Sequence, residues 1–153
     1  MSRLKNLFKR DRNKLVVFIT AGFPKKESTE ELVLQAIEGG ADMIEIGIPF
    51  SDPQADGPII QKASEIALSN GITLSIIFDQ VRSIRKKTDI PIALMGYYNP
   101  ILAYGIDNFL NDCKTSQIDG IILPDLPLDE GTFFCEKAKS CLLYTSPSPR
   151  DQS

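Results

Sequence analysis

The sequence predicts an α/β fold in which parallel strands alternate with helices. One indication is the repeated order of short, β-rich apolar runs and longer segments of helical periodicity. A second is spacing: the runs begin at residues 15, 41, 91 and 119, so they lie 26, 50 and 28 residues apart. This suits a β-α repeat of about thirty residues with one extra helix after the second run. A third is that runs such as 15–20 are apolar on both faces, as strands covered on both sides must be.

The N-terminal segment and the four runs supply the first elements. Leu4, Leu7 and Phe8 recur at helical spacing among basic residues, which predicts a short amphipathic helix that covers one end of the core. The four predicted strands cover residues 15–20, 41–48, 91–97 and 119–125.

Capping residues mark the expected helix ends. Ser28 and Glu31 have the spacing of a capping box, which predicts a helix that starts there and ends at a Gly-Gly pair. Thr73 is expected to cap the second of two helices after the second strand. The expected helices cover residues 28–39, 59–70, 73–87, 106–116 and 129–139.

Composition and charge exclude several classes of partner. The 153 residues are 42% hydrophobic and 24% charged, as in ordinary globular proteins. The net charge of −3 provides no field that would concentrate the protein on nucleic acid or on an anionic membrane. We therefore expect neither of these as a partner.

Cysteine usage and hydropathy bear on location. Cys113, Cys135 and Cys141 form neither a CxxC pair nor an even set, so we interpret them as reduced thiols that fill apolar space. The basic segment 1–14 lacks the apolar core of a secretory signal, and no stretch resembles a membrane-spanning helix. These observations predict a cytoplasmic protein.

The sequence contains no histidine, the residue that most often acts as general base or metal ligand. Nucleophile systems of the Ser/His/Asp or Cys/His type are therefore excluded. Any acid–base chemistry must rely on carboxylates, lysine or tyrosine.

The absence of nucleotide motifs favours a barrel over an open doubly wound sheet. Neither GxGxxG nor GxxxxGK[ST] follows any predicted strand. A complete barrel needs eight strands and about 250 residues, whereas this sequence supplies about four β-α units. We therefore expect residues 1–140 to form the N-terminal half of a (β/α) barrel. From residue 141 periodicity gives way to a Ser-Pro-rich segment, so residues 141–153 are expected to be a non-native or disordered tail.

Glu45 is the first candidate for acid–base chemistry. Alternation along its strand places Glu45 and Gly47 on one face, and Ile44 and Ile46 on the face toward the helices. Glu45 would then point into the barrel near the C-terminal end of the strand, where barrel enzymes assemble their active sites. A structural ion pair is an alternative of equal weight.

The loop after this strand carries two further carboxylates. Asp52 and Asp56 lie in the Pro/Gly-rich segment GIPFSDPQADGP, which can fold back over the strand end. Glu45 and Asp56 could take separate acid and base roles because their environments differ. For Asp52, which precedes Pro53, an Asx turn is at least as good an explanation.

Two aromatic residues are candidates for contacting a flat substrate. Alternation along the third strand sends Tyr97 inward, where its phenol could pack on a ring and donate one hydrogen bond. Phe18 could offer an aromatic wall. Burial in an ordinary core is the simpler explanation of both.

The segment IEIGIPFSDPQADGP at residues 44–58 resembles the signature of the tryptophan synthase α-subunit family. FITAGFP at 18–24, GYYNP at 96–100 and PDLP at 124–127 follow in that family's order, and the resemblance spans roughly residues 4–140. It implies a (β/α)8 TIM barrel and a lyase of tryptophan biosynthesis. The implied reaction is the retro-aldol cleavage of indole-3-glycerol phosphate into indole and glyceraldehyde 3-phosphate.

Position by position, the resemblance assigns roles to individual residues. It implies that Glu45 is the catalytic acid–base that handles protons at the indole C3 carbon and the glycerol hydroxyl. It implies that Asp56 is the second catalytic carboxylate, which accepts a hydrogen bond from the indole N–H. No metal and no organic cofactor are implied. The apolar positions that it places around the indole are Phe18, Met95, Tyr97 and Ile122.

The resemblance also implies a partner. Members of the family dock on a pyridoxal-phosphate β subunit in an αββα heterotetramer, and Asp52 and Pro53 lie on the implied docking surface. The residues that hold the substrate phosphate belong to later strands, so we expect residues 1–153 alone to be close to inactive. Two alternatives stay open: a noncatalytic half-barrel fragment that binds a partner or another copy of itself through unpaired strand edges, and another phosphate-binding barrel enzyme.

Overall fold

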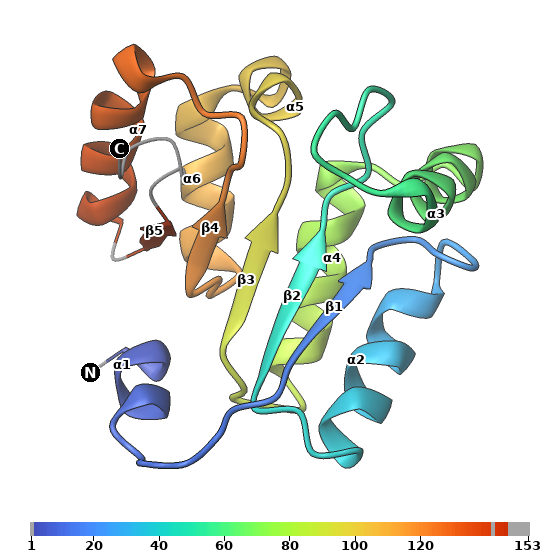
Figure 1. Cartoon of the computed structure of the whole chain (residues 1–153), viewed down its shortest axis with the longest axis vertical. Coiled ribbons are helices and arrows are strands. Elements are labelled where there is room, and N and C mark those ends of the chain that lie inside the picture. Colours follow the sequence, from blue (N-terminus) through green and yellow to red (C-terminus); the bar gives the residue numbers. More distant parts are fainter. Residues whose placement is uncertain (1, 142, 147–153) are drawn as a thin grey trace.

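The computed structural model describes residues 2–141 and 143–146, which build one parallel sheet with helices around it. The sheet has five strands in the order β1-β2-β3-β4-β5, and every neighbouring pair is parallel. The arrows of β1 to β4 in Figure 1 accordingly point the same way. The strands are β1 (Val16–Thr20), β2 (Met43–Gly47), β3 (Ile92–Met95), β4 (Gly120–Ile122) and β5 (Tyr144–Ser146).

The helices divide between the two ends and the outer face of the sheet. Figure 1 shows α1 at the end where the strands begin, and α3, α5 and the loop after β2 at the end where they finish. The helices are α1 (Arg3–Phe8), α2 (Ser28–Glu38), α3 (Pro58–Ser69), α4 (Leu74–Arg85), α5 (Tyr98–Tyr104), α6 (Ile106–Thr115) and α7 (Leu128–Ser140). Within the described residues, no helix combines the length and the apolar character needed to cross a membrane.

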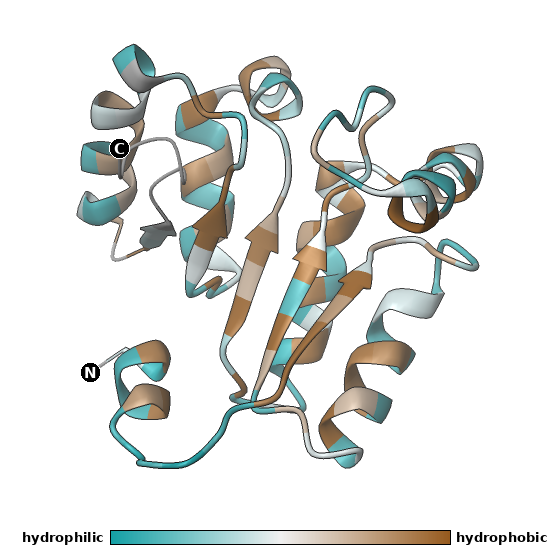
Figure 2. Ribbon diagram, in the orientation of Figure 1, coloured by the Kyte–Doolittle hydropathy of each residue, from teal (hydrophilic) through white to brown (hydrophobic). Residues whose placement is uncertain are grey.

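The strand residues alternate between two apolar clusters, as the pattern along β2 predicts. Ile44 and Ile46 are fully buried in the main core, which lies between the sheet and its helices. On the opposite face, Met43 and Ala93 form a second, smaller cluster with Leu4 of α1. Figure 2 shows mostly brown along β1 to β4, with a teal band on β2, and teal in the segment after α1 and in bands on the helices. The prediction for Phe8 was wrong, because its side chain is 64% exposed.

The predicted caps were correct at one helix and wrong at another. Thr73 caps α4, and its hydroxyl accepts a hydrogen bond from the Ile76 amide at 3.3 Å. Ser28, by contrast, is already the first residue of α2, and the N-cap position belongs to Glu27. The Ser28 hydroxyl accepts from the Lys25 amide instead, so it stabilises the preceding turn and no capping box forms.

Two elements were not expected. The segment after β3 forms α5, although no helix was expected there before residue 106; Pro100 lies in the first turn, where a proline is tolerated. The side chain of Asp125, in the loop after β4, accepts a hydrogen bond at 3.0 Å from the amide of Tyr98, the first residue of this helix. The second element is β5, which pairs with β4 beyond the predicted four strands.

The β5 strand lies beyond the expected boundary at residue 140. Residues 144–146 pair with β4, so the ordered sheet extends past residue 140, and the interpretation of residues 141–153 as non-native stays a prediction. A strand of three residues is too short to show periodicity, and its place depends on backbone pairing that sequence pattern does not reveal. Residues 142 and 147–153 lie outside the described residues.

A buried charge network closes the end of the sheet where the strands begin. The Arg85 and Asp119 side chains are 5% and 7% exposed, and their charged atoms lie 2.7 Å apart. The Asp119 carboxylate also accepts a hydrogen bond from the Ile92 amide at 2.9 Å and forms an ion pair with Arg3 at 3.3 Å. Arg85 further donates to the main-chain carbonyl of Gln117. These buried contacts hold the strand starts together, so we assign this end of the sheet a structural role.

Candidate functional site

The candidate site lies where the strands finish, on the face of the sheet opposite the main core. Strand pairing arranges the residues on this face, called inward here, in two rows across the sheet. In the lower row, nearer the strand starts, Phe18 pairs with Glu45. Gly47, two residues beyond Glu45, pairs with Met95, which in turn pairs with Ile122. The sequence-predicted residues on the strands therefore share one face.

A pocket at the strand ends brings four of the predicted residues together. Phe18, Asp56, Met95 and Tyr97 line it from three different parts of the chain. Glu45 and Ile122 do not line this pocket: Glu45 lies one row deeper on β2, and Ile122 lies beside Met95 on β4. The pocket is small, about 10 Å³, with Asp56 of the loop in its wall and Glu45 one row deeper on β2.

Glu45 is half-buried and, within the described part of the chain, has no hydrogen-bond or ion-pair partner. A structural ion pair was the alternative explanation of a glutamate at this position. The arrangement does not support that alternative, because the neighbouring inward residues on β1 and β3 are Phe18 and Ala93. A carboxyl group in these surroundings is available to exchange a proton with a bound molecule.

Asp56 reaches the pocket on the loop of residues 51–57, between β2 and α3. The Gln61 side chain of α3 donates to the main-chain carbonyl of Asp56 at 2.8 Å. Asp52 is exposed on the same loop, and the Gln54 amide donates to its main-chain carbonyl at 3.0 Å rather than to its side chain. The Asx-turn explanation of Asp52 is therefore not supported, whereas the folding of the loop over the strand end is as expected.

Tyr97 connects β3 to this loop. Its ring is 5% exposed and lies 5.4 Å, centroid to centroid, from the ring of Phe50. Its hydroxyl oxygen accepts a hydrogen bond from the Ala55 amide at 2.9 Å. Burial raises the pKa of the Tyr97 phenol above its ordinary value of 10, donation from Ala55 opposes this, and the charge of Asp56 raises it further. The phenol therefore stays protonated at neutral pH.

Sequence reasoning missed three small residues of the pocket. Thr20 and Ser64 are buried polar residues that line it. Thr20 follows from alternation, since it lies two residues beyond Phe18 on β1. Gly47 lies directly under the Phe18 ring: a Cβ atom there would stand 2.4 Å from Cζ of that ring. Glycine is thus required for the ring to lie against the strand.

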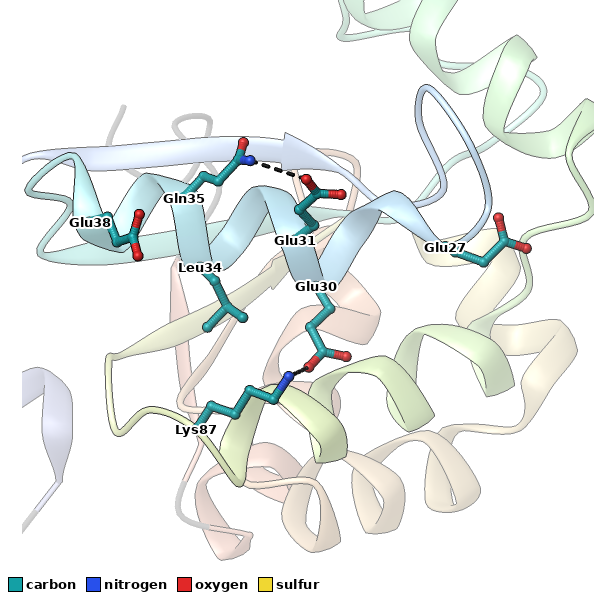
Figure 3. Close-up of a pocket in the computed structure, with 7 residues that line it drawn as sticks. All are labelled: Glu27, Glu30, Glu31, Leu34, Gln35, Glu38 and Lys87. Carbon is teal, nitrogen blue, oxygen red and sulfur yellow. Dashed lines mark hydrogen bonds and ion pairs between the residues drawn. The ribbon is translucent and has the colours of Figure 1, made fainter.

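A second hollow, of about 480 Å³, lies on the outer surface along α2 and is shown in Figure 3. Lys87 forms an ion pair with Glu30 at 2.7 Å and lowers the pKa of that carboxyl, while Gln35 donates to Glu31 at 3.2 Å. Its acidic groups are exposed to solvent or paired, so it offers no arrangement for catalysis. The residues that line it are Glu27, Glu30, Glu31, Leu34, Gln35, Glu38 and Lys87. In the described ranges, no three histidine, cysteine or acidic side chains are grouped to hold a metal ion.

The fold and the site define a class of protein: a partial β/α barrel with carboxylates at the carboxyl ends of its strands, where barrel enzymes place their chemistry. A model of the family described as tryptophan synthase alpha chain matches residues 4–145. The chain belongs to this family.

Individual relatives agree with this assignment. The tryptophan synthase alpha chain of Petrotoga mobilis is 50% identical over 139 residues, which are 91% of this chain and 54% of the relative. That of Caldanaerobacter subterraneus is 47% identical over 145 residues, 95% of this chain and 55% of the relative. The chain thus spans about half the length of the curated relatives it matches.

Solved structures show the same likeness. Tryptophan synthase subunit alpha from Legionella pneumophila superposes with a TM-score of 0.89 at 41% identity, over 95% of this chain and 57% of that one. A chain of the tryptophan synthase complex from Pyrococcus furiosus superposes with a TM-score of 0.81 at 44% identity, over 86% and 54% of the two chains. The expected TIM-barrel fold class is therefore confirmed, with this chain forming part of a barrel.

Proposed function

We propose that this chain supplies the acid–base half of an active site that cleaves indole-3-glycerol phosphate into indole and glyceraldehyde 3-phosphate. The observation that carries the proposal is the placement of two carboxylates. Glu45 is inward on β2 without an ion-pair partner among the described residues, and Asp56 lies on the loop beside the aromatic pocket. Membership of the tryptophan synthase alpha chain family supports the choice of reaction.

The chemistry matches two carboxylates with separate tasks. Cleavage breaks the bond between indole C3 and the adjacent glycerol carbon. C3 gains a proton, the hydroxyl on that carbon loses one, and the products are indole and an aldehyde, so no oxidant or second substrate is needed. Glu45 would exchange protons at C3 and at the hydroxyl. Asp56 would accept a hydrogen bond from the indole N–H and stabilise the positive charge that develops on the ring.

The remaining residues would orient the substrate. Phe18 and Met95 present apolar surfaces from adjacent rows of the sheet, and Ile122 extends that surface to β4. An indole ring placed there would have its flat faces against apolar groups and its N–H toward the loop. The phosphate would be held by later strands, as in the sequence-based expectation, so residues 1–153 alone should have little activity.

The proposal is tested by joining residues 1–146 in frame to the C-terminal part of the Petrotoga mobilis relative and measuring indole release. We expect the joined protein to release indole from indole-3-glycerol phosphate. In the joined protein, Glu45→Gln should strongly lower the rate of indole release. Its matched control is Glu65→Gln, which changes an exposed glutamate on α3 that pairs only with Lys62 within the described residues. A folded joined protein that releases no indole under any condition tested would overturn the proposal.

We further propose that the loop around Asp52 and Pro53 docks on a tryptophan synthase β subunit. The Asp52 side chain is exposed, and an apolar groove of about 420 Å³ adjoins the loop beside Pro49, Phe50 and Ser51. The known Pyrococcus furiosus complex supports a partner of this kind. In the joined protein, Asp52→Ala should abolish mutual stimulation with a β subunit while leaving folding intact. Unchanged stimulation would argue against this surface.

Self-association is a second candidate function, favoured by one specific observation. Strand β1 forms an edge of the sheet. An apolar groove of about 520 Å³ runs beside it, and Val16 and Ile59 are 41% and 84% exposed. Exposed strand edges with apolar surroundings pair readily with other chains. Sedimentation of residues 1–153 decides the matter: a concentration-dependent dimer supports association, and a monomer at all concentrations removes it.

A further inference from the structure

The loop that carries Asp56 is held at two points. One is local, because Gln61 belongs to the first turns of the helix that follows the loop. The other is distant in sequence: Tyr97 lies two residues beyond β3, at the N-cap of α5, and 42 residues from Ala55. The first contact ties the loop to α3, and the second ties it to the segment after β3.

The Tyr97 contact fixes the peptide between Gln54 and Ala55, one residue before Asp56. The Ala55 amide donates to the Tyr97 hydroxyl at 2.9 Å, so the backbone that precedes the Asp56 Cα is tied to the barrel wall. The Tyr97 ring is itself immobilised by burial and by the neighbouring Phe50 ring. The anchor is therefore rigid, whereas the loop residues it holds are exposed: Ser51, Asp52, Gln54 and Ala55.

The position of Asp56 depends on this anchor for a physical reason. A loop with exposed backbone and few buried contacts opens locally at low cost. One neutral hydrogen bond is worth about 0.5–1.5 kcal/mol. Removing the long-range bond would therefore leave the carboxylate on a backbone that samples more orientations, and catalytic geometry tolerates little displacement.

We propose that Tyr97 is a positioning residue whose hydroxyl latches the loop 51–57 and holds Asp56 over the pocket. The latch is a property of the chain's own structure. Its catalytic consequence rests on the function proposed above, in which Asp56 faces the indole N–H.

The first test measures hydrogen exchange in the 153-residue chain by mass spectrometry. Tyr97→Phe removes the hydroxyl and keeps the ring. The matched control is Tyr104→Phe, because the Tyr104 hydroxyl donates to Asp112 of α6 and not to a residue of the loop. We expect exchange in residues 51–57 to rise about two- to tenfold in Tyr97→Phe, as the loss of one hydrogen bond predicts, and to stay unchanged in Tyr104→Phe. Equal exchange in both variants would overturn the latch.

The second test is a tyrosine titration followed by NMR with carbon-13 at Cζ. If Asp56 is held beside the phenol, Asp56→Asn lowers the pKa of Tyr97 because it removes a nearby negative charge. The pKa of Tyr104 should not change, since Asp112 is the carboxylate that controls it. An unaltered Tyr97 titration in Asp56→Asn would show that the loop lies elsewhere, and the proposal would be wrong.

The third test separates positioning from binding in the joined protein. Tyr97→Phe should lower kcat about two- to tenfold, the range of one hydrogen bond, and leave KM nearly unchanged. In an Asp56→Asn background the same change should have no further effect, because Tyr97 acts through Asp56. Full additivity of the two changes contradicts the positioning role. The hydrogen-exchange and titration tests do not depend on enzymatic activity. If both give the expected results and the joined protein is inactive, the positioning of Asp56 by Tyr97 stands and only the proposed function is rejected.

Discussion

The buried charge network at the base of the sheet gives the sharpest stability prediction. Arg85→Met keeps the apolar stem of the side chain and removes the guanidinium. It leaves Asp119 buried with the more distant Arg3, at 3.3 Å, as its cationic neighbour, and it leaves the carbonyl of Gln117 without this donor. Breaking a buried pair in this way costs about 3–5 kcal/mol. Because Arg3 remains, we expect about 3 kcal/mol, the lower end of that range.

The assay is thermal unfolding followed by circular dichroism. For a chain of this length, 1 kcal/mol corresponds to about 2–4 °C in Tm, so Arg85→Met should lower Tm by roughly 6–12 °C. The control is Lys62→Met at the ion pair with Glu65, where both side chains are 70% exposed. That pair is expected to contribute about 0–1 kcal/mol.

A further variant tests the cause. Adding Asp119→Asn to Arg85→Met removes the unpaired buried charge, so the double variant should recover part of the lost stability. If Arg85→Met and the Lys62→Met control have the same Tm, the buried pair does not stabilise the fold and the prediction is wrong. If the double variant is less stable by the full sum of the single effects, the explanation by an unpaired charge fails.

Three further predictions concern the pocket, the pH dependence and a helix cap. Gly47→Ala should push the Phe18 ring away from the strand and cost about 1–3 kcal/mol through overpacking, measured as a lower Tm; an unchanged Tm would contradict the close approach. Arg12, with the Leu15 amide, holds the pKa of Asp42 below its ordinary 3.8, so this stabilisation is present above about pH 4 and is lost as the pH falls through the lower folded value. Melting curves from neutral to acid pH should therefore show a shallower loss in Arg12→Gln than in the parent, and parallel curves would count against the pair. Thr73→Ala should cost about 1 kcal/mol by removing the cap of α4, whereas Thr73→Ser should keep most of it.

Alternation along the strands can be predicted because it follows from backbone geometry alone. The period of two places Glu45 on the face opposite Ile44 and Ile46, and the observed burial agrees. The loop with Asp56 is also expected at the strand end, because proline and glycine interrupt the pattern there.

Features that depend on contacts distant in sequence could not be predicted. Arg85 and Asp119 resemble ordinary surface charges until the fold brings them together. The strand pattern directs the Tyr97 hydroxyl toward a substrate, whereas the structure shows it bonded to the Ala55 amide. Ser28 fails as a cap because its neighbours form a turn that uses the same hydroxyl.

The candidate site combines predicted positions with proposed roles. The structure brings Phe18, Met95, Tyr97 and Asp56 into one pocket and places Glu45 one row below it. These positions are compatible with cleavage chemistry, and the roles stay predictions until proton transfer is measured. The distinction matters most for Glu45, whose position on β2 follows from alternation and whose catalytic role follows from the proposed reaction.

The most direct test of the central claim is the rate of indole release by the joined protein with Glu45→Gln. Glutamine keeps the size and polarity of the side chain but cannot exchange a proton as an acid–base group. If Glu45 is the acid–base residue, the variant should fold and its rate should fall by about a hundredfold or more, within the usual contribution of a general acid–base residue, while Glu65→Gln retains the parent rate. A Glu45→Gln variant that releases indole as fast as its parent would show that Glu45 is not the acid–base residue.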